Sequence, residues 1–366
     1  MHIVIFYLAN YIYVELKLSS LAKAKEEVLI ALSVRKLIER GWLTALLGYL
    51  AKREELSVRL KYIGDVRLRR TTFGALAIST YYASKCWPRL PEDLAKTGRL
   101  LKPQEAPLWL VTALSLASYA CRLQASGNRV SINTSPERVG LEVNGVPAVF
   151  DTHCANAYDI AEIFAMGLYE VPEVLSGLRG RDVVDVGASA GDTALYFVLN
   201  GARKVIAVEP LPKVARCAEE NVRLSGAADK VKVINAALSD EPVSVPCDYD
   251  LLSSRYFSTL SSSGPCKVPG VTLGDLLNMV DDPYLLKMDC EGCEAQVILG
   301  PERGRLRTFE HIIFETHPHI TGVSDEKLLT SLKELSFECG PPLVYDSRLH
   351  AGTYHCKGRN IASKVT

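Results

Sequence analysis

The stretch DVVDVGASAGDT, from Asp182 to Thr193, decides how the second half of the chain folds. A short apolar segment runs into a turn of small residues, and a helical pattern follows. The small side chains from Gly187 to Gly191 let a ligand approach the backbone, and the N-terminus of the next helix offers free N–H groups. The stretch therefore predicts a strand, a ligand-binding turn and a helix in succession.

Short apolar segments alternate with helical segments along the rest of this half, a pattern typical of a parallel sheet covered by helices on both faces. We predict strands at 182–186, 204–208, 231–236, 284–289 and 310–315. Helices are expected at about 191–200, 212–225, 273–280, 293–300 and 324–335. The segments near 337–345 and 352–357 are too close for a helical crossover, so we expect an antiparallel hairpin at the sheet edge.

The ends of the second and third strands carry residues suited to an adenosine. The second strand is followed by Glu209, where a carboxylate can accept hydrogen bonds from both ribose hydroxyls. The third leads to Asn235 and Ala236, where an adenine would lie, and to the small Ala237 beside it. An adenosine belongs both to a dinucleotide and to S-adenosylmethionine, so these residues alone leave two cofactors open.

The turn distinguishes the two cofactors. A dinucleotide fingerprint would place glycine at 189 and 192, whereas this chain has Ser189 and Asp192. A carboxylate at the helix start would repel a pyrophosphate, but it would suit a cationic sulfonium, as would Asp185. S-adenosylmethionine is therefore the predicted cofactor.

The ordered runs DVGASAGDTALYF, KVIAVEPLP, VINAALSD, VTLGDLL and LLKMDCEGCE resemble the FkbM-type S-adenosylmethionine-dependent methyltransferases over about residues 157–320. The resemblance implies a class I, Rossmann-like methyltransferase fold: a seven-stranded, mostly parallel sheet with an antiparallel last strand and helices on both faces. It also carries over Asp185, Gly187, Gly191, Asp192 and Glu209 as cofactor-binding positions. The full set of expected cofactor-binding residues is Asp185, Gly187, Ala188, Ser189, Gly191, Asp192, Thr193, Glu209, Pro210, Asn235, Ala236 and Ala237.

The reacting groups are expected where the fourth and fifth strands end, because ligands of open α/β sheets bind there. Asp289, Glu291 and Glu294 form a dense carboxylate cluster after the fourth strand. Glu315 and His317 lie at the end of the fifth. Methyl transfer to oxygen requires an oriented acceptor and removal of its proton. His317 is our first choice for the general base, because imidazole titrates near neutral pH, with Glu315 as the other proton acceptor and Asp289 or Glu291 as the orienting group.

A structural alternative stays open for the same residues. His317 and His319 would then lie in a loop, and Glu291 and Glu294 would cap the following helix. Lys287, on a strand expected to be buried, is predicted to pair with an acid such as Glu315.

Metal and redox chemistry are not indicated by the spacing of these groups. The carboxylates and His317 offer oxygen and nitrogen donors that suit Mg or Mn, but no spacing is diagnostic, and we predict no metal. Cys290 and Cys293 have the spacing of a zinc or redox pair, yet a lone pair inside another motif is weak evidence. We expect the ten cysteines mostly to pack as small hydrophobic residues.

Residues 1–150 are the predicted first domain, a basic helical and hairpin region without recognisable chemistry, and 151–366 the methyltransferase domain. The first holds 21 Lys plus Arg against 12 Asp plus Glu, and the second 21 against 30. Two helices are expected between Ser19 and Arg53, a helix over Leu108–Leu123, and a hairpin turning at Asn144-Gly145. A hairpin over Val58–Arg70, turning at 63–65, would gather four cations on one face: Arg59, Lys61, Arg67 and Arg69.

Composition bounds the remaining expectations. With 366 residues, 48% hydrophobic and 23% charged, the chain has the composition of a soluble globular protein, which excludes disorder and collagen. The apolar runs are shorter than the roughly 20 residues of a bilayer span, and the start of the chain lacks signal-peptide features. We therefore expect no membrane span and a cytoplasmic location. The chain has three Gln, and this scarcity fits a thermophile.

The expected reaction is methylation of a hydroxyl on a small-molecule or glycan acceptor: a sugar, glycan, glycolipid or other secondary metabolite. The alternative is an RNA methyltransferase whose basic region holds the nucleic acid, and a third reading is a non-catalytic cofactor-binding module. A Ser-rich segment, SSRYFSTLSSSGPCKVPG, is interpreted as a lid in which Arg255, Tyr256 and Phe257 contact the acceptor. The sequence predicts no oligomeric state.

Overall fold

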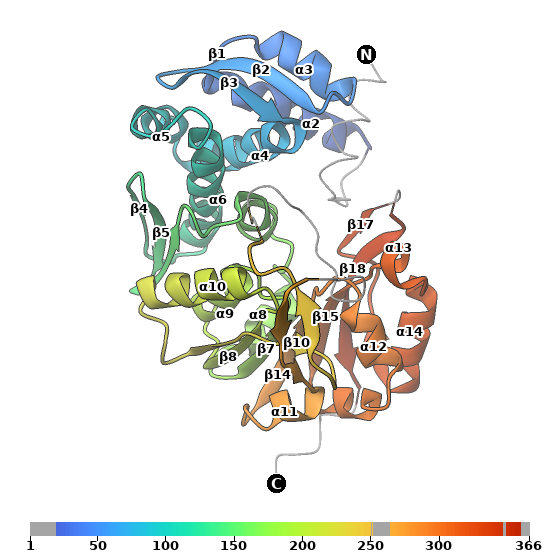
Figure 1. Cartoon of the computed structure of the whole chain (residues 1–366). Helices are drawn as coiled ribbons and strands as arrows, with labels where there is room; N and C mark the ends of the chain where they lie inside the picture. Colours follow the sequence, from blue (N-terminus) through green and yellow to red (C-terminus); the bar gives the residue numbers. More distant parts are fainter. Residues whose placement is uncertain (1–19, 250, 252–263, 347–348, 360–366) are drawn as a thin grey trace. The chain divides into compact units, whose positions relative to one another are not determined.

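The structure, a computed structural model, describes residues 20–249, 251, 264–346 and 349–359 (Figure 1). The chain forms two compact units, residues 1–168 and 169–366. The division falls after Leu168, later than the expected boundary at 150/151, because the segment after the second hairpin packs on the helices of the first unit.

The second unit is built on a mixed sheet of eight strands. Along the main path the order is β16-β18-β15-β14-β7-β8-β9, and β17 also pairs with β18. The five strands from β15 to β9 run parallel. Their bounds are Asp182–Val186 (β7), Lys204–Val208 (β8), Val231–Ile234 (β9), Pro283–Met288 (β14) and His311–Glu315 (β15).

The far edge differs from the expected hairpin and makes the sheet eight-stranded instead of seven-stranded. The predicted strand near 337–345 is two short strands, β16 (Phe337–Cys339) and β17 (Val344–Asp346). Both pair antiparallel with the long β18 (Ala351–Gly358), which itself runs antiparallel to β15. Pro341 and Pro342 separate them, and prolines cannot donate to a strand ladder. The antiparallel last strand implied by the family resemblance is present as β18.

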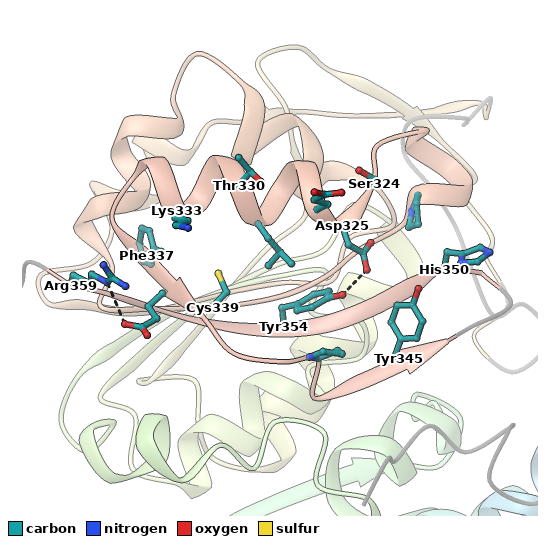
Figure 2. A pocket seen from close by; sticks show the side chains of 15 residues that line it. Ser324, Asp325, Thr330, Lys333, Phe337, Cys339, Tyr345, His350, Tyr354 and Arg359 are labelled. Atoms are coloured by element: carbon teal, nitrogen blue, oxygen red, sulfur yellow. Dashed lines mark hydrogen bonds and ion pairs between the residues drawn. The ribbon is translucent and has the colours of Figure 1, made fainter. Parts of the chain in front are cut away.

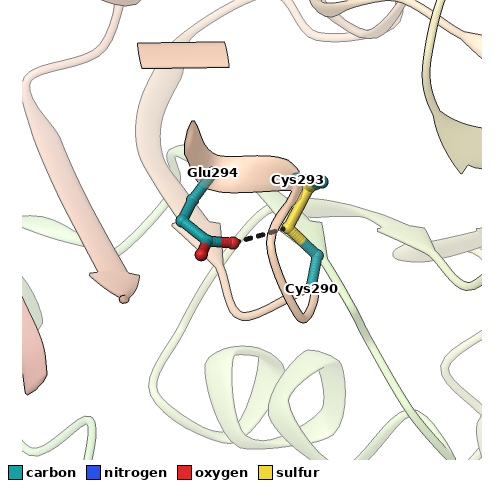
Figure 3. A group of neighbouring side chains, drawn as sticks. All are labelled: Cys290, Cys293 and Glu294. Atoms are coloured by element: carbon teal, nitrogen blue, oxygen red, sulfur yellow. Dashed lines mark hydrogen bonds between the residues drawn. A yellow bond between two sulfur atoms is a disulfide. The ribbon is translucent and has the colours of Figure 1, made fainter. Parts of the chain in front are cut away.

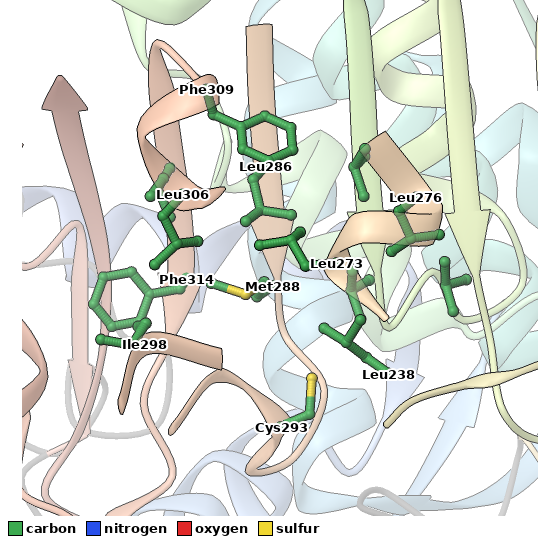
Figure 4. Packing of buried hydrophobic residues seen from close by; sticks show 14 of the residues in the cluster. Leu238, Leu273, Leu276, Leu286, Met288, Cys293, Ile298, Leu306, Phe309 and Phe314 are labelled. Atoms are coloured by element: carbon green, nitrogen blue, oxygen red, sulfur yellow. The ribbon is translucent and has the colours of Figure 1, made fainter. Parts of the chain in front are cut away.

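Helices cover both faces of this sheet, at nearly the predicted positions. On one face, side chains of alternate strand residues pack with α11 (Leu273–Leu277), α12 (Cys293–Leu299) and α14 (Asp325–Glu334). Figure 4 shows this core, with Leu286, Met288 and Phe314 from the strands against Leu276 and Ile298 from the helices. On the other face α9 (Asp192–Leu199) packs on β7 and β8, and α10 (Pro212–Leu224) on β9. The central strands are therefore buried on both sides, as a parallel sheet requires.

The first unit combines helices with two small antiparallel sheets. Its helices are α2 (Ser20–Ser33), α3 (Trp42–Leu50), α4 (Arg70–Cys86), α5 (Leu90–Gly98), α6 (Ala106–Ala125) and the short α7 (Ala157–Ile160). Its strands are β1 (Ile38–Arg40), β2 (Glu55–Leu60), β3 (Gly64–Arg69), β4 (Val130–Thr134), β5 (Arg138–Val143) and β6 (Val146–Asp151). Both predicted hairpins are present, but β1 and β4 add a third strand to each, which the sequence analysis missed.

The first hairpin has the expected two faces but a different turn. Leu60 pairs with Gly64, so the turn comprises residues 61–63. Its inner strand positions are buried and its basic face is more exposed, yet cations of this face have intramolecular partners. Arg59 contacts Glu39 and Asp65, at 3.2 and 2.8 Å, and Lys61 contacts Glu92 at 3.4 Å. Carboxylates of the same unit therefore offset part of the charge repulsion that had suggested an anionic partner.

One described helix, α6, is long and apolar enough to cross a membrane, by length and composition. It is the central helix of the first unit, and 83% of its most apolar window is buried inside the structure.

The cysteines do not act as small hydrophobic residues alone: none is free, and the sequence expectation was wrong on this point. Disulfides join Cys86 to Cys121, Cys247 to Cys266, Cys290 to Cys293 and Cys339 to Cys356. Sequence spacing hides such pairing, because it depends on which elements become neighbours in the fold.

Candidate active site

The turn between β7 and α9 has the tight geometry that its small residues predicted. Gly187, Ser189 and Gly191 have positive φ angles of 75°, 47° and 80°. A Cβ on Gly187 would lie 1.8 Å from the carbonyl oxygen of Asp289. Gly187 is therefore required because the loop after β14 packs against it, a reason that differs from the expected close approach of a ligand.

Hydrogen bonds fix the ends of this turn. The N–H groups of Gly187 and the buried Ala188 both donate to the carbonyl oxygen of Val208, at 3.0 and 3.1 Å. Thr193 Oγ1 donates to Asp185 Oδ2 at 2.6 Å, and Asp192 accepts from the Thr193 N–H at 2.8 Å. These bonds hold the turn to the ends of β8 and β7.

Glu209 lies where the sequence placed it and is joined directly to the turn. Its Oε2 accepts the Ser189 N–H at 3.1 Å and its Oε1 accepts the Leu211 N–H at 2.9 Å. Burial raises the pKa of Glu209 to about 7, although both backbone hydrogen bonds act to lower it. This carboxyl group therefore changes charge near neutral pH.

The residues expected near the adenine, Asn235 to Ala237, lie together in the structure, but Asn235 has a different role from the expected one. Asn235 Nδ2 donates to the carbonyl oxygens of Glu209 and Pro210, at 2.9 and 3.0 Å. Its amide group thus positions the loop that carries Glu209. Ala236 and Ala237 are both buried beside it, and Ala237 begins the short strand β10 (Ala237–Leu238).

Lys287 pairs with an acid, as predicted, but the acid is Asp185 and not the suggested Glu315. The two residues stand directly opposite each other on β14 and β7, and Lys287 Nζ lies 3.2 Å from Asp185 Oδ1. Nζ also donates to the carbonyl oxygen of Gly187 at 2.6 Å. Burial lowers the pKa of Lys287, but the charges of Asp185, Asp289 and Asp192 outweigh it, so the net pKa is raised. Charged Lys287 therefore fixes the turn between β7 and α9 through Asp185 and the carbonyl oxygen of Gly187.

His317 is the centre of the carboxylate cluster at the ends of β14 and β15. It is buried, 3% exposed. Its Nδ1 lies 3.0 Å from Glu294 Oε1, and its Nε2 lies 3.4 Å from Glu291 Oε2 and 3.9 Å from Asp289 Oδ1. The structure thus brings together all four predicted catalytic residues, because side-chain atoms of Asp289, Glu315 and His317 lie within 4.8 Å of one another. Glu294 of the expected carboxylate cluster lies beside them and is fully buried.

The charges of this cluster determine the protonation of His317. Burial alone would lower its pKa, but the hydrogen bond to Glu294 and the charges of Glu294, Glu291 and Glu315 raise the pKa to about 10. The imidazole is therefore protonated at neutral pH. It can orient and neutralise carboxylates, but it is not a ready acceptor for a substrate proton.

Two other side chains complete this part of the site. Tyr169 Oη donates to Asp289 Oδ2 at 3.4 Å. Glu294 also accepts the N–H of Gly292 at 3.0 Å, so it binds the start of α12 and His317 together. Glu294 therefore both caps α12 and belongs to the carboxylate cluster, the two roles that the sequence left open. His319 is exposed, with its ring centroid 6.0 Å from that of His317.

Neither group of potential metal ligands in the described residues fits a metal ion. Cys290, Cys293 and Glu294 lie close enough, but both sulfur atoms are in a disulfide and cannot bind as thiolates. Asp289, Glu315 and His317 are the second group. A metal ion there would have to displace the proton that the neighbouring carboxylates hold on His317, so the group does not favour one.

A groove of about 980 Å³ begins at Pro318, directly after His317, and runs between α14 and the strands β16 to β18. Figure 2 shows Tyr345 and Tyr354 along its floor, with Tyr354 Oη donating to Asp325 at 2.7 Å. The Tyr345 ring is 37% exposed. The groove therefore offers an aromatic surface and hydrogen-bonding groups, and Pro318 connects its lining to His317 along the chain. The predicted lid contacts, Arg255, Tyr256 and Phe257, lie outside the described residues.

The strand order and the glycine turn define a Rossmann-like methyltransferase fold. Residues 185–339 match the methyltransferase FkbM domain. This match supports an S-adenosylmethionine-dependent methyltransferase domain, and the resemblance predicted from the sequence is confirmed for these residues.

Shorter similarities join the chain to other methyltransferases. It is 38% identical over 78 residues to protein arginine N-methyltransferase PRMT10 of Oryza sativa subsp. japonica, and 37% identical over 79 residues to protein arginine N-methyltransferase 6 of Xenopus laevis. These matches cover 21% and 22% of this chain and 20% and 22% of the relatives, so the chain spans about a fifth of their length.

Among solved structures, the METTL16 methyltransferase domain is similar with a TM-score of 0.38 and 12% identity, over 70% of this chain and 80% of that chain. A putative tRNA (m1A22) methyltransferase of Streptococcus pneumoniae, solved with S-adenosyl-L-methionine, is similar with a TM-score of 0.32 and 14% identity. That similarity covers 52% of this chain and 72% of the other.

Proposed function

We propose that the protein transfers the methyl group of S-adenosylmethionine to a hydroxyl oxygen of a sugar, glycan, glycolipid or other secondary metabolite. The observation that carries this proposal is the carboxylate cluster around His317 at the ends of β14 and β15. O-methylation needs a group that orients the acceptor oxygen and takes its proton as the new bond forms. Carboxylates held by a buried imidazolium can supply both.

The residues of the cofactor turn fit this cofactor. When bound, S-adenosylmethionine supplies an electrophilic methyl group on a cationic sulfur atom. Glu209 accepts the ribose hydroxyls, because each carboxylate oxygen has a further lone pair beyond the one used by the Ser189 or Leu211 N–H. Lys287 keeps the turn in place through the Gly187 carbonyl oxygen.

Asp289 is the proposed proton acceptor. Its side chain is 30% exposed and lies at the strand end, whereas Glu294 is fully buried and bound to His317. His317 keeps its own proton and, through Nε2, orients Asp289 and Glu291. In the transfer, the acceptor oxygen bonds to the methyl carbon, the carbon–sulfur bond breaks, and the hydroxyl proton passes to Asp289.

The groove beyond His317 is the proposed place for the rest of the acceptor. A sugar ring stacks well on an exposed aromatic face such as that of Tyr345. Asp325 and the Tyr354 hydroxyl group can hydrogen-bond its other hydroxyls. An extended glycan or glycolipid would therefore be held with one hydroxyl at Asp289.

The cofactor is tested by calorimetric titration with S-adenosylhomocysteine and, separately, with NADH. We expect micromolar binding of the first ligand only, and a loss of about 1.5–3 kcal/mol in Glu209→Ala, the range for a hydrogen bond to a charged group. Glu220→Ala is the matched control, because Glu220 is a carboxylate of the same unit that pairs with Arg223 on the surface. Binding of NADH instead would overturn the proposal.

The acceptor is tested by transfer of a labelled methyl group to a panel of sugars, glycolipids and RNA. We expect label in a hydroxyl-bearing sugar compound, and Asp289→Asn should abolish this transfer while leaving S-adenosylhomocysteine affinity within about twofold. Label in RNA alone would replace the proposed acceptor by the nucleic-acid alternative.

A further inference from the structure

The Cys290–Cys293 disulfide differs from the other three named disulfides in what it can do for stability. It joins residues 3 apart in sequence, whereas the others span separations of 35, 19 and 17. The loss of entropy that a cross-link imposes on the unfolded chain grows with the length of the closed loop. The Cys290–Cys293 bond is therefore the weakest structural cross-link of the four.

The Cys290–Cys293 disulfide lies beside both the cofactor turn and the carboxylate cluster. Cys290 follows Asp289, whose carbonyl oxygen packs against Gly187 of the cofactor turn. Cys290 Sγ lies 3.4 Å from Glu294 Oε2, and the other oxygen of that carboxylate holds His317 (Figure 3). The disulfide thus closes the loop that joins the cofactor turn to the carboxylate cluster.

The two sulfur atoms differ in access. Cys290 is partly exposed, whereas Cys293 is 3% exposed. An external thiolate can reach the sulfur atom of Cys290, and the sulfur atom of Cys293 can then act as the leaving group. This asymmetry is the one that thiol–disulfide exchange uses.

We propose that Cys290 and Cys293 form a redox-active site that exchanges with an external dithiol, and that its state sets the position of the catalytic carboxylates. One thiolate of the dithiol attacks Cys290 Sγ, the sulfur–sulfur bond breaks, and Cys293 leaves and takes a proton. The second thiolate then attacks the dithiol sulfur of the mixed bond, and Cys290 leaves and is protonated. The pair gains two electrons and two protons, and the dithiol becomes a disulfide.

Reduction changes the hydrogen bonding of Glu294. In the disulfide, Cys290 has no proton to donate. In the reduced state its thiol can donate to Glu294 Oε2, which already accepts the Gly292 N–H. A third donor on this carboxylate competes with Gly292 and His317, and the opened loop can move Asp289 and Glu291. The effect on methyl transfer rests on the proposed function, but the exchange and its effect on His317 do not.

The first test measures which disulfide opens. The full chain is equilibrated with graded reduced and oxidised dithiothreitol, free thiols are alkylated, and each cysteine is quantified by peptide mass spectrometry. We expect Cys290 and Cys293 to be alkylated at about tenfold lower dithiol ratio than Cys339 and Cys356 of the same unit. Opening at the same ratio or later would overturn the proposal.

The second test measures the coupling to the site. The His317 imidazole resonance and the S-adenosylhomocysteine affinity are recorded before and after mild reduction. We expect the resonance to shift and the affinity to fall about threefold or more. Cys290→Ser/Cys293→Ser should resemble the reduced protein in both states, and Cys339→Ser/Cys356→Ser should respond like the wild type.

The outcomes separate this proposal from the proposed function. An unchanged His317 resonance after selective opening of Cys290–Cys293 would overturn the coupling. If no form of the protein binds S-adenosylhomocysteine, the proposed function fails, while the alkylation pattern and the His317 resonance still decide the redox proposal. Because the wild-type protein is also measured in both states, misfolding of a variant does not block the test.

Discussion

Cofactor affinity should fall as the pH decreases from 8 to 6, because Glu209 binds the ribose hydroxyls best as a carboxylate. With a pKa of about 7 in the free protein, the ionised fraction drops from about 90% at pH 8 to about 10% at pH 6. Ribose hydroxyls donate to the ionised form and lower the pKa in the complex. Affinity should therefore decrease by roughly tenfold, or about 1.4 kcal/mol.

The assay is calorimetric titration of S-adenosylhomocysteine at pH 6, 7 and 8, in buffers of different ionisation heat. Binding near pH 6 should release close to one proton per site, and binding at pH 8 almost none. Glu209→Gln cannot titrate, so its affinity should be lower at pH 8 and nearly constant over this range. A pH-independent wild-type affinity, or an equal slope in Glu209→Gln, would refute the reasoning.

Four further outcomes test the site and the basic face. Lys287→Met should destabilise the protein by about 3–5 kcal/mol in urea unfolding, because Asp185 is left as an uncompensated buried charge, and Lys287→Met/Asp185→Asn should recover much of the loss. Gly187→Ala should cost more than about 3 kcal/mol by the same measurement, against about 1 kcal/mol for Gly226→Ala, a positive-φ position with open space around it. The pKa of His317 is about 10 in the folded protein and about 6.5 in the unfolded chain. Protonated His317 therefore contributes fully to the free energy of unfolding below pH 6.5, and this contribution is lost as the pH rises toward 10. The advantage in unfolding free energy over His317→Gln should shrink across that window, and the imidazole resonance should not titrate between pH 6 and 8. If the protein binds RNA, neutralising the basic face should flatten the salt dependence of RNA binding, and an unchanged slope would exclude this face as the RNA-binding surface. The residues to neutralise are Arg59, Lys61, Arg67 and Arg69.

The sequence predicted the core of the second unit well because its signals are local. A run of apolar residues ending in a glycine turn produces β7 and α9 almost at the predicted bounds. The carboxylate that follows β8 reaches that turn because neighbouring parallel strands end at the same edge. Prediction succeeded where the fold follows from period and turn chemistry.

The errors concern partners that become neighbours only in the folded chain. Lys287 pairs with Asp185 because the strand register sets them opposite each other, and register cannot be read from one strand alone. The disulfides depend in the same way on neighbouring elements. Glu294 was expected in the carboxylate cluster or as a helix cap, but its direct contact with His317 depends on how α12 and β15 meet in the fold.

The same distinction governs the assignment of the general base. Residue type favoured His317, because a free imidazole titrates near pH 6.5. The fold surrounds that imidazole with Glu294, Glu291 and Glu315, and their charges raise its pKa to about 10. We therefore propose that the proton is accepted by the carboxylate that the imidazolium orients. The identity of the base is a property of the cluster, so it follows from which side chains meet and not from which residue types occur.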